Sequence, residues 1–344
     1  MQYVRLGGTG VRVSPLCLGA MMFGGWGEPD HGNGIETIHA ALDAGINFID
    51  TANVYSEGES ERIVGKALKG RRDGVVLATK LYGAMSEDPN DRGTSRRHII
   101  QEVENSLRRL DTDYIDLYQV HRPDPLTDLS ETLGALDDLV RQGKVRYIGS
   151  STFPPDEVVE AQWAASRDGL QRFVSEQPPY SIFVRHVEEA LLPVAQRYRM
   201  GVLAWSPLAG GWLSGRFRKG RPYDQTGRAK RSPERFDPSK PENQRKYDII
   251  EQLVPLAQEE GISLVELGVS WVLEHPAVTS AIIGPRNRRQ LEGQLKAGDI
   301  CLSTETLDAV DEIVPPGVTL NKADEGYMPP WLDVRYRRRR RDLS

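Results

Sequence analysis

Short apolar runs alternate with amphipathic stretches along most of this chain. The runs have the length of buried strands, and the stretches between them repeat apolar residues three and four positions apart, as one face of a helix does. We expect strands at residues 16–19, 46–50, 75–80, 114–121, 145–150, 173–177, 201–205 and 280–283. We expect helices around residues 35–42, 63–68, 99–110, 129–140, 157–165, 187–198 and 264–273, with a last one opening within 284–290.

This alternation predicts an α/β fold. Parallel strands need crossover helices, so regular strand–helix units favour a parallel sheet. Eight such units favour a closed (β/α)8 TIM barrel, a parallel eight-stranded barrel, over an open sheet. Residues 3–13 alternate across a Gly-rich turn and predict an N-terminal β-hairpin. We therefore expect a single barrel domain over residues 1–330.

Two segments depart from the alternation. Residues 207–241 are rich in Gly, Arg and Pro and are too long for an ordinary barrel connection, so we expect a functional loop there. Residues 331–344 form a basic C-terminal tail, whose like charges repel one another and favour a solvated extension. A contact with a partner or with another copy of the chain is the alternative for this tail.

Ionisable side chains stand where three successive strands are expected to end. The first of these strands ends on Asp50 and is followed by Tyr55, the next ends on Lys80, and the third ends on His121. The carboxyl ends of barrel strands meet at the face where active sites lie, so we expect the four side chains to converge. A charge at the mouth of a buried strand is costly without a partner, and Lys80 can pair with Asp50.

These four residue types suit the protonation of an oxyanion. A phenol titrates near pH ~10 in water, and a nearby ammonium, here Lys80, favours its ionised form. Asp50 could keep Lys80 charged, and His121 could bind the substrate oxygen, so that Tyr55 protonates a carbonyl oxygen as it gains charge. Taken alone, each residue is more often a helix cap, a surface charge or a structural residue. Their occurrence on consecutive strands is what indicates a site, and a reduction would also need a hydride source.

The second half of the chain offers residues suited to a dinucleotide. Ser151 and Gln177 could bind a carboxamide, and Trp205 offers a flat face to a nicotinamide ring. Residues 206–211 form a tight Gly-containing loop able to wrap a pyrophosphate, and residues 284–290 open a helix whose N-terminus favours anions. Three arginines could neutralise phosphates, although any one of them could equally be a solvated surface charge: Arg216, Arg228 and Arg286.

Composition narrows the classes of protein. Hydrophobic content of 39% with 27% charged residues is typical of a soluble globular chain, and a net charge of -5 gives no case for nucleic acid or membrane binding. The two cysteines lie far apart, which excludes a disulfide framework and favours a reducing compartment, so we expect a cytoplasmic protein. The motifs G-x-G-x-x-G, P-loop, H-E-x-x-H and G-x-S-x-G are missing, and His121 with Asp124 is too weak a cluster to predict a metal.

The ordered motifs resemble those of the aldo-keto reductases. Asp50-Thr-Ala-x-x-Tyr55, Thr79-Lys80, the strand ending at His121, and Ile283-Gly284 follow one another as in that family, over residues 6–295. The resemblance implies a (β/α)8 barrel, NAD(P)H as cofactor, and a catalytic tetrad of Asp50, Tyr55, Lys80 and His121. Four further motifs are similar to the branch with the potassium-channel beta subunits and their bacterial relatives: Glu61-x-x-x-Gly65-Lys66, Gly93-x-Ser95-Arg96, Arg122-Pro-Asp-Pro125 and Trp205-Ser-Pro-Leu-Ala209.

The resemblance also implies where the ligands bind. It places the cofactor at Gly19, Ala20, Met21, Asp50, Ser151, Thr152, Gln177, Trp205, Ser206, Pro207, Leu208, Gly210, Arg216, Arg228, Gly284, Arg286, Gln290 and Gln294. A partly apolar mouth for the carbonyl substrate is expected from Met22, Trp26 and Tyr82, together with Tyr55 and His121. The chain departs from the family at Thr152, where Asn or Arg is frequent, and at Gly293 and Gln294, where an acid or amide and then Asn usually face the adenine.

Two functions follow from the resemblance. The favoured one is NADPH-dependent reduction of a small-molecule aldehyde or ketone to the alcohol, with a hydride from the nicotinamide and a proton from Tyr55. The alternative is a redox-sensing or regulatory scaffold of the same fold that binds the cofactor and turns over little. His121 favours turnover, because that position is not histidine in all sensor-like members. The sequence leaves a homo-oligomer open.

Overall fold

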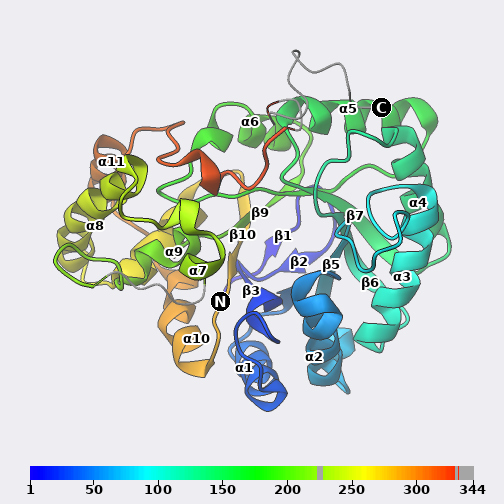
Figure 1. Cartoon of the computed structure of the whole chain (residues 1–344), viewed down its shortest axis with the longest axis horizontal. Helices are drawn as coiled ribbons and strands as arrows, with labels where there is room; N and C mark the ends of the chain where they lie inside the picture. The colour runs from blue at the N-terminus through cyan, green and yellow to red at the C-terminus, as the bar shows by residue number, and fades with distance from the viewer. Residues whose placement is uncertain (223–227, 330–331, 333–344) are drawn as a thin grey trace.

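Eight parallel strands form a closed barrel at the centre of the chain (Figure 1). The computed structural model describes residues 1–222, 228–329 and 332. The barrel strands are β3 (Leu16–Gly19), β4 (Phe48–Asp50), β5 (Val76–Leu81), β6 (Ile115–Val120), β7 (Val145–Ser151), β8 (Ser175–Gln177), β9 (Gly201–Trp205) and β10 (Val278–Ile283). Neighbours in sequence are neighbours in the barrel, and β10 pairs with β3 to close it. The predicted (β/α)8 barrel is confirmed.

A short antiparallel hairpin precedes the barrel, as the sequence predicts. It consists of β1 (Val4–Arg5) and β2 (Arg12–Val13). Its Leu6 is fully buried with apolar side chains of the barrel interior, among them Phe48 and Leu203. Gly8 N donates to Arg199 O at 2.7 Å, just before β9 begins. The hairpin therefore covers the end of the barrel where strands start, opposite the end where the predicted site residues lie.

Helices surround the barrel. They are α1 (His31–Asp43), α2 (Glu59–Leu68), α3 (Arg96–Leu110), α4 (Leu129–Arg141), α5 (Pro155–Asp168), α6 (Leu191–Arg197), α9 (Leu264–Glu274) and α10 (Arg288–Leu295). Side chains cap several of them: Asp30 accepts from the first turn of α1, and Asn287 from that of α10. The helix expected over residues 187–198 is shorter in the structure. Pro193 has no amide N–H and fits a first turn, so α6 begins at Leu191.

Two helices beyond the eight strand–helix units were not predicted. They are α8 (Pro241–Glu259) and α11 (Thr304–Ile313), which pack against each other at one side of the barrel (Figure 1). The expected long loop also holds the short helix α7 (Arg228–Arg231). The 3-10 turns are η1 (Ala20–Met22), η2 (Tyr55–Gly58), η3 (Arg72–Gly74), η4 (His186–Glu188), η5 (Ala209–Ser214), η6 (Pro233–Arg235), η7 (Lys296–Asp299) and η8 (Lys322–Asp324).

The predicted basic tail lies outside the described residues, apart from Leu332. Within the ranges that the structure describes, none of the helices combines the length and the apolar character needed to cross a bilayer.

A buried carboxyl group stands on β8, one residue before Gln177. Glu176 is fully buried; Ser150 Oγ donates to its Oε2 at 2.5 Å and Phe153 N donates to its Oε1 at 3.2 Å. Burial raises the pKa of Glu176 to about 7, although these hydrogen bonds and Arg122 act in the opposite direction. The folded state therefore binds a proton here that the unfolded chain releases near pH 4.5.

Stability should accordingly fall as pH rises from about 4.5 to about 7. At about 1.4 kcal/mol per pH unit, Glu176 alone should remove about 3 kcal/mol over that interval. Glu176→Gln cannot titrate, and its amide can donate to Ser150 while its oxygen accepts from Phe153. Urea unfolding of both proteins at pH 5 and pH 8 gives their free energies of unfolding. Relative to wild type, the variant should be more stable at pH 8 than at pH 5. Parallel losses in both proteins would show that Glu176 does not titrate in this range.

Candidate active site

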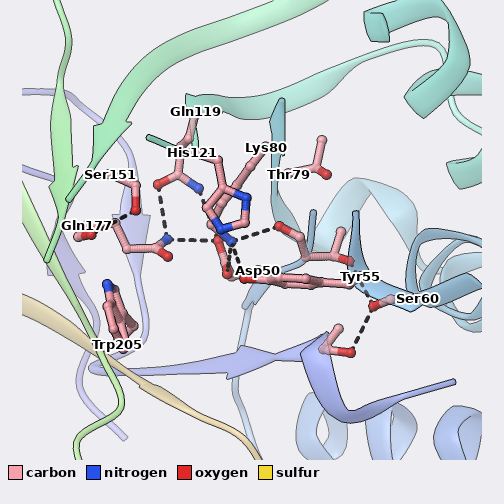
Figure 2. Close-up of polar contacts among 12 residues, drawn as sticks. Asp50, Tyr55, Ser60, Thr79, Lys80, Gln119, His121, Ser151, Gln177 and Trp205 are labelled. Atoms are coloured by element: carbon pink, nitrogen blue, oxygen red, sulfur yellow. Dashed lines mark hydrogen bonds and ion pairs between the residues drawn. The ribbon is translucent and has the colours of Figure 1, made fainter. Parts of the chain in front are cut away.

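The ends of β4, β5 and β6 bring the four predicted catalytic side chains together. Lys80 Nζ donates to Asp50 Oδ1 at 2.5 Å, to the carbonyl of Thr51 at 2.9 Å and to Tyr55 Oη at 3.3 Å. Figure 2 shows the imidazole of His121 directed toward this group. The Tyr55 and His121 rings meet edge to face, with centroids 5.6 Å apart. A buried ion pair is thus joined directly to a phenol and lies beside an imidazole.

Amide donors hold the second oxygen of Asp50. Gln119 Nε2 donates to Oδ2 at 3.0 Å, and Gln177 Nε2 donates to the same oxygen at 2.9 Å and to Gln119 Oε1 at 3.1 Å (Figure 2). With Lys80, three donors therefore satisfy a carboxylate that is almost fully buried. Gln119 was not predicted from the sequence. Its signal is a polar residue in an apolar strand, two positions before His121 and hence on the same face.

The surroundings set the charges of this group. Burial lowers the pKa of Lys80, but Asp50 and Tyr55 raise it more, so the net direction is upward and the amine is an ammonium. Burial lowers the pKa of His121 well below its usual value, and the cations of Arg122 and Lys80 lower it further. The imidazole is therefore neutral near pH 7 and carries a single N–H donor.

A cavity of about 1030 Å³ opens above this group at the carboxyl ends of the strands. It is large enough for a dinucleotide together with a small substrate. Most of the predicted site residues line it: Gly19, Met21, Met22, Trp26, Asp50, Tyr55, His121, Ser151, Gln177, Trp205, Ser206, Pro207, Leu208, Gly210, Arg216, Arg228, Gly284, Arg286, Gln290 and Gln294.

Four predicted residues do not line the cavity. Lys80 is fully buried beneath its floor, where it contacts Asp50, Tyr55 and the carbonyl of Thr51. Ala20 is fully buried, and its carbonyl accepts from Ser60 Oγ at 2.8 Å. Thr152 is buried and directs its hydroxyl toward the indole N–H of Trp205, at 3.4 Å. Tyr82 is half-buried, in the turn that follows β5.

Several residues that line the cavity were not predicted from the sequence. They are Val54, Arg122, Ser214, Arg231, Ser232, Glu234, Arg235, Val265, Ile282, Ala323 and Gly326. Gly326 shows how closely the C-terminal segment approaches Trp205. A Cβ at this glycine would lie 2.5 Å from Trp205 Cζ2, and its φ of +77° is one that other residues rarely adopt. No sequence pattern marks it, since it follows the barrel by many residues.

Backbone strain gathers at the same ends of the strands. Positive φ angles occur at Tyr82 after β5, at Thr152 after β7, and at Ser206 and Ala209 after β9. Each such non-glycine residue costs about 1–3 kcal/mol, and such residues cluster at ligand sites. Ser206 Oγ accepts from Gly210 N at 2.7 Å, which closes the tight turn expected in this loop.

Two cations of the cavity wall, Arg228 and Arg231, form no ion pair with an acid among the described residues. Burial, together with the charges of Arg235 and Arg231, lowers the pKa of Arg228 to about 10. Its guanidinium contacts Met22 Sδ at 3.9 Å, and in the described part of the chain no carboxylate pairs with it. Arg231 donates to the carbonyl of Trp26 at 2.9 Å and stacks over its ring. Such a cluster fits a ligand that carries phosphates.

A separate cluster of ionisable groups lies on α3 and in the segment that precedes it. Asp91, His98 and Glu102 place three potential metal-ligand atoms within 4.8 Å of one another. Glu102, however, accepts from Arg109 and from Asn105 Nδ2. Arg109 also donates to Glu61 Oε2 at 2.6 Å, so its guanidinium neutralises two buried carboxylates. We assign this network to the packing of α2 against α3.

Comparisons with known proteins agree with this arrangement. The model of the Aldo/keto reductase family matches residues 15–315. The uncharacterized oxidoreductase YrpG of Bacillus subtilis is 42% identical over 331 residues, covering 92% of this chain and 97% of its own. A probable voltage-gated potassium channel subunit beta of Oryza sativa is 36% identical, covering 91% and 97%. The putative aryl-alcohol dehydrogenase AAD16 of Saccharomyces cerevisiae is 33% identical, covering 92% and 98%. The chain therefore belongs to the aldo/keto reductase family.

Proposed function

We propose that this protein reduces an aldehyde or ketone to the alcohol with NADPH, and that Tyr55 gives the proton. One observation carries the proposal. A fully buried ammonium, Lys80, is paired with Asp50 and donates to the phenol oxygen of Tyr55 at the floor of the cavity. Membership of a family of oxidoreductases supports the reaction type.

The hydrogen bonds indicate how the protein's groups act. Because Lys80 donates to Tyr55 Oη, the phenol hydrogen is free to point at an acceptor in the cavity. A substrate carbonyl oxygen there would accept from Tyr55 and from the N–H of neutral His121. Lys80 then lies beside the phenolate that forms as the proton leaves, and stabilises it. A bound reduced nicotinamide would supply the hydride.

The residues present fit such a cofactor. Gln177 uses its N–H groups on Asp50 and Gln119, so its Oε1 is left to accept from a carboxamide. Ser151 Oγ donates to Gln177 O at 2.9 Å and can still accept from the same carboxamide. Trp205 would provide a face for the nicotinamide ring, and Arg228 with the turn at residues 206–211 would hold the phosphates.

We expect NADPH to be preferred over NADH because of Arg286. It lines the cavity at the start of α10, where arginine can bind a ribose phosphate by charge-assisted hydrogen bonds. Arg286→Ala should weaken NADPH binding about 10- to 100-fold more than NADH binding. Arg288→Ala is the matched control, because Arg288 pairs with Glu292 at 2.9 Å outside the cavity. Titration of intrinsic fluorescence with each nucleotide gives the constants, and equal weakening of both would show that Arg286 does not read the phosphate.

The second candidate function is a redox sensor or regulatory scaffold that binds NADPH with little turnover. It is favoured by the similarity to proteins described as probable voltage-gated potassium channel beta subunits. The presence of His121 in the cavity favours the enzyme. NADPH consumption with a panel of aldehydes and ketones separates the two: sustained turnover supports the reductase, whereas tight NADPH binding without turnover supports the sensor.

A further inference from the structure

We infer that the carbonyl substrate carries a carboxylate, and that Arg122 binds it. This inference rests on the proposed function and specifies its substrate. Arg122 follows His121 directly after β6 and lines the same cavity. Its backbone position is therefore set by the strand that also places the imidazole.

The guanidinium of Arg122 contacts only neutral acceptors. Its Nη1 donates to the carbonyl of His121 at 2.5 Å and to Thr152 Oγ1 at 3.2 Å. Across residues 1–222, 228–329 and 332, no ion pair joins it to a carboxylate. Glu176 interacts with Arg122 electrostatically, but its carboxyl group accepts hydrogen bonds from Ser150 and from the amide of Phe153. The Arg122 guanidinium is therefore a largely buried cation without a counter-charge, which is costly unless a bound ligand supplies one.

Three well-buried arginines outside the cavity are paired with carboxylates. Arg185 pairs with Glu188 and with Asp311, at 2.9 and 2.7 Å. Arg72 pairs with Asp116 at 2.7 Å, and Arg109 pairs with two glutamates. Buried guanidinium groups with a structural role thus have carboxylate partners within the fold. Arg122 lines the cavity and has no such partner, so we expect the ligand to supply the carboxylate.

The geometry favours a carboxylate close to the reacting carbonyl. Nη1 is used, which leaves Nε and Nη2 as two parallel donors, the fork that matches a carboxylate. Arg122 lines the cavity together with Tyr55, the proposed proton donor. Burial lowers the pKa of the guanidinium, while Tyr55, Glu176 and Tyr82 act in the opposite direction. The guanidinium is on the side of the catalytic histidine, whereas Arg228 and Arg231 are neighbours of Met22 and Trp26.

The cavity residues beside Tyr55 suit an aromatic ring in the substrate. Trp26 lies 6.0 Å from Tyr55, centroid to centroid, and Met22 and Val54 line the cavity beside them. Such side chains pack well against a ring. An aromatic aldehyde bearing a carboxylate, such as 4-carboxybenzaldehyde, therefore represents the substrate class.

The ratio of kcat/KM values for a carboxylated and an uncharged aldehyde tests the inference. We would measure kcat/KM for 4-carboxybenzaldehyde and for benzaldehyde with wild type, Arg122→Met, Arg122→Lys and, as a control, Arg288→Met. The ratio of the first value to the second should fall about 10- to 100-fold in Arg122→Met. Arg122→Lys should be intermediate, because it keeps the charge and loses the fork. Arg288→Met should keep the wild-type ratio. An unchanged ratio in Arg122→Met, or an equal fall for both aldehydes, would overturn the inference.

Binding decides the matter without turnover. Calorimetry with benzoate and its neutral analogue benzamide should show tighter binding of benzoate to wild type, and loss of that preference in Arg122→Met. Benzoate that binds no tighter than benzamide overturns the inference. A wild type that prefers benzoate yet reduces neither these aldehydes nor the wider panel of aldehydes and ketones keeps the carboxylate site and removes the proposed reductase function, so the two failures are distinguishable.

Discussion

Replacing Tyr55 with phenylalanine should slow carbonyl reduction by about 10²- to 10⁴-fold, the usual contribution of a positioned general acid. The substitution keeps the ring that packs against Trp26 and His121 and removes the hydroxyl to which Lys80 donates. Steady-state kcat with a reactive aldehyde measures the effect. Tyr198→Phe is the matched control, since Tyr198 lies at the end of α6 away from the cavity and should leave kcat unchanged.

NADPH binding by Tyr55→Phe should remain close to wild type, because the residues proposed to hold the cofactor are untouched. A variant that lost both binding and turnover would point to disruption of the cavity. Near-normal reduction would remove Tyr55 from the mechanism.

Replacing Lys80 with methionine should collapse turnover and also destabilise the fold. The substitution removes the cation beside the developing phenolate and leaves the Asp50 carboxylate buried with only amide donors. Removing one partner of a buried ion pair costs about 3–5 kcal/mol. Urea unfolding at pH 7 and kcat measure the two effects, and a variant with wild-type stability would contradict the buried pair.

A double variant separates charge balance from catalysis. Asp50→Asn combined with Lys80→Met leaves no unpaired charge at the floor of the cavity. Stability should therefore recover part of the loss seen in Lys80→Met, while turnover should stay low because the ammonium is still missing. Adding Tyr55→Phe to Lys80→Met should lower the rate far less than the product of the two single effects, since the pair acts as a unit.

The barrel could be predicted because its strands and helices have distinct periods. Residues 201–205 form an apolar run that corresponds to β9, and the apolar stripe within residues 99–110 marks the inner face of α3. The helix α8 was missed because its buried positions, such as Ile250 and Leu253, follow a stretch of Gly, Arg and Pro that resembles a loop. The helix α11, which packs against α8, follows the last strand–helix unit of the barrel, so the alternation of strands and helices does not predict it.

The candidate site could be predicted where chemistry coincides with the end of a strand. Asp50 and His121 stand where apolar runs stop, and parallel pairing then brings them to one face. Gln119 was hidden because it lies inside its strand and acts on Asp50 from below. Gly326 could not be placed, because its position depends on how the C-terminal segment folds over the cavity. Arg122 follows His121, but the absence of a carboxylate partner for it depends on how segments far apart in the sequence pack together.

Single-turnover oxidation of bound NADPH tests the central claim most directly. Protein loaded with one equivalent of NADPH is mixed with excess 4-carboxybenzaldehyde, and the loss of nicotinamide absorbance is followed for wild type and Tyr55→Phe. Our account predicts rapid, complete oxidation by wild type and a rate about 10²- to 10⁴-fold lower for the variant. A wild type that holds NADPH and leaves it unoxidised by this and other aldehydes, or equal rates in the two proteins, would contradict it.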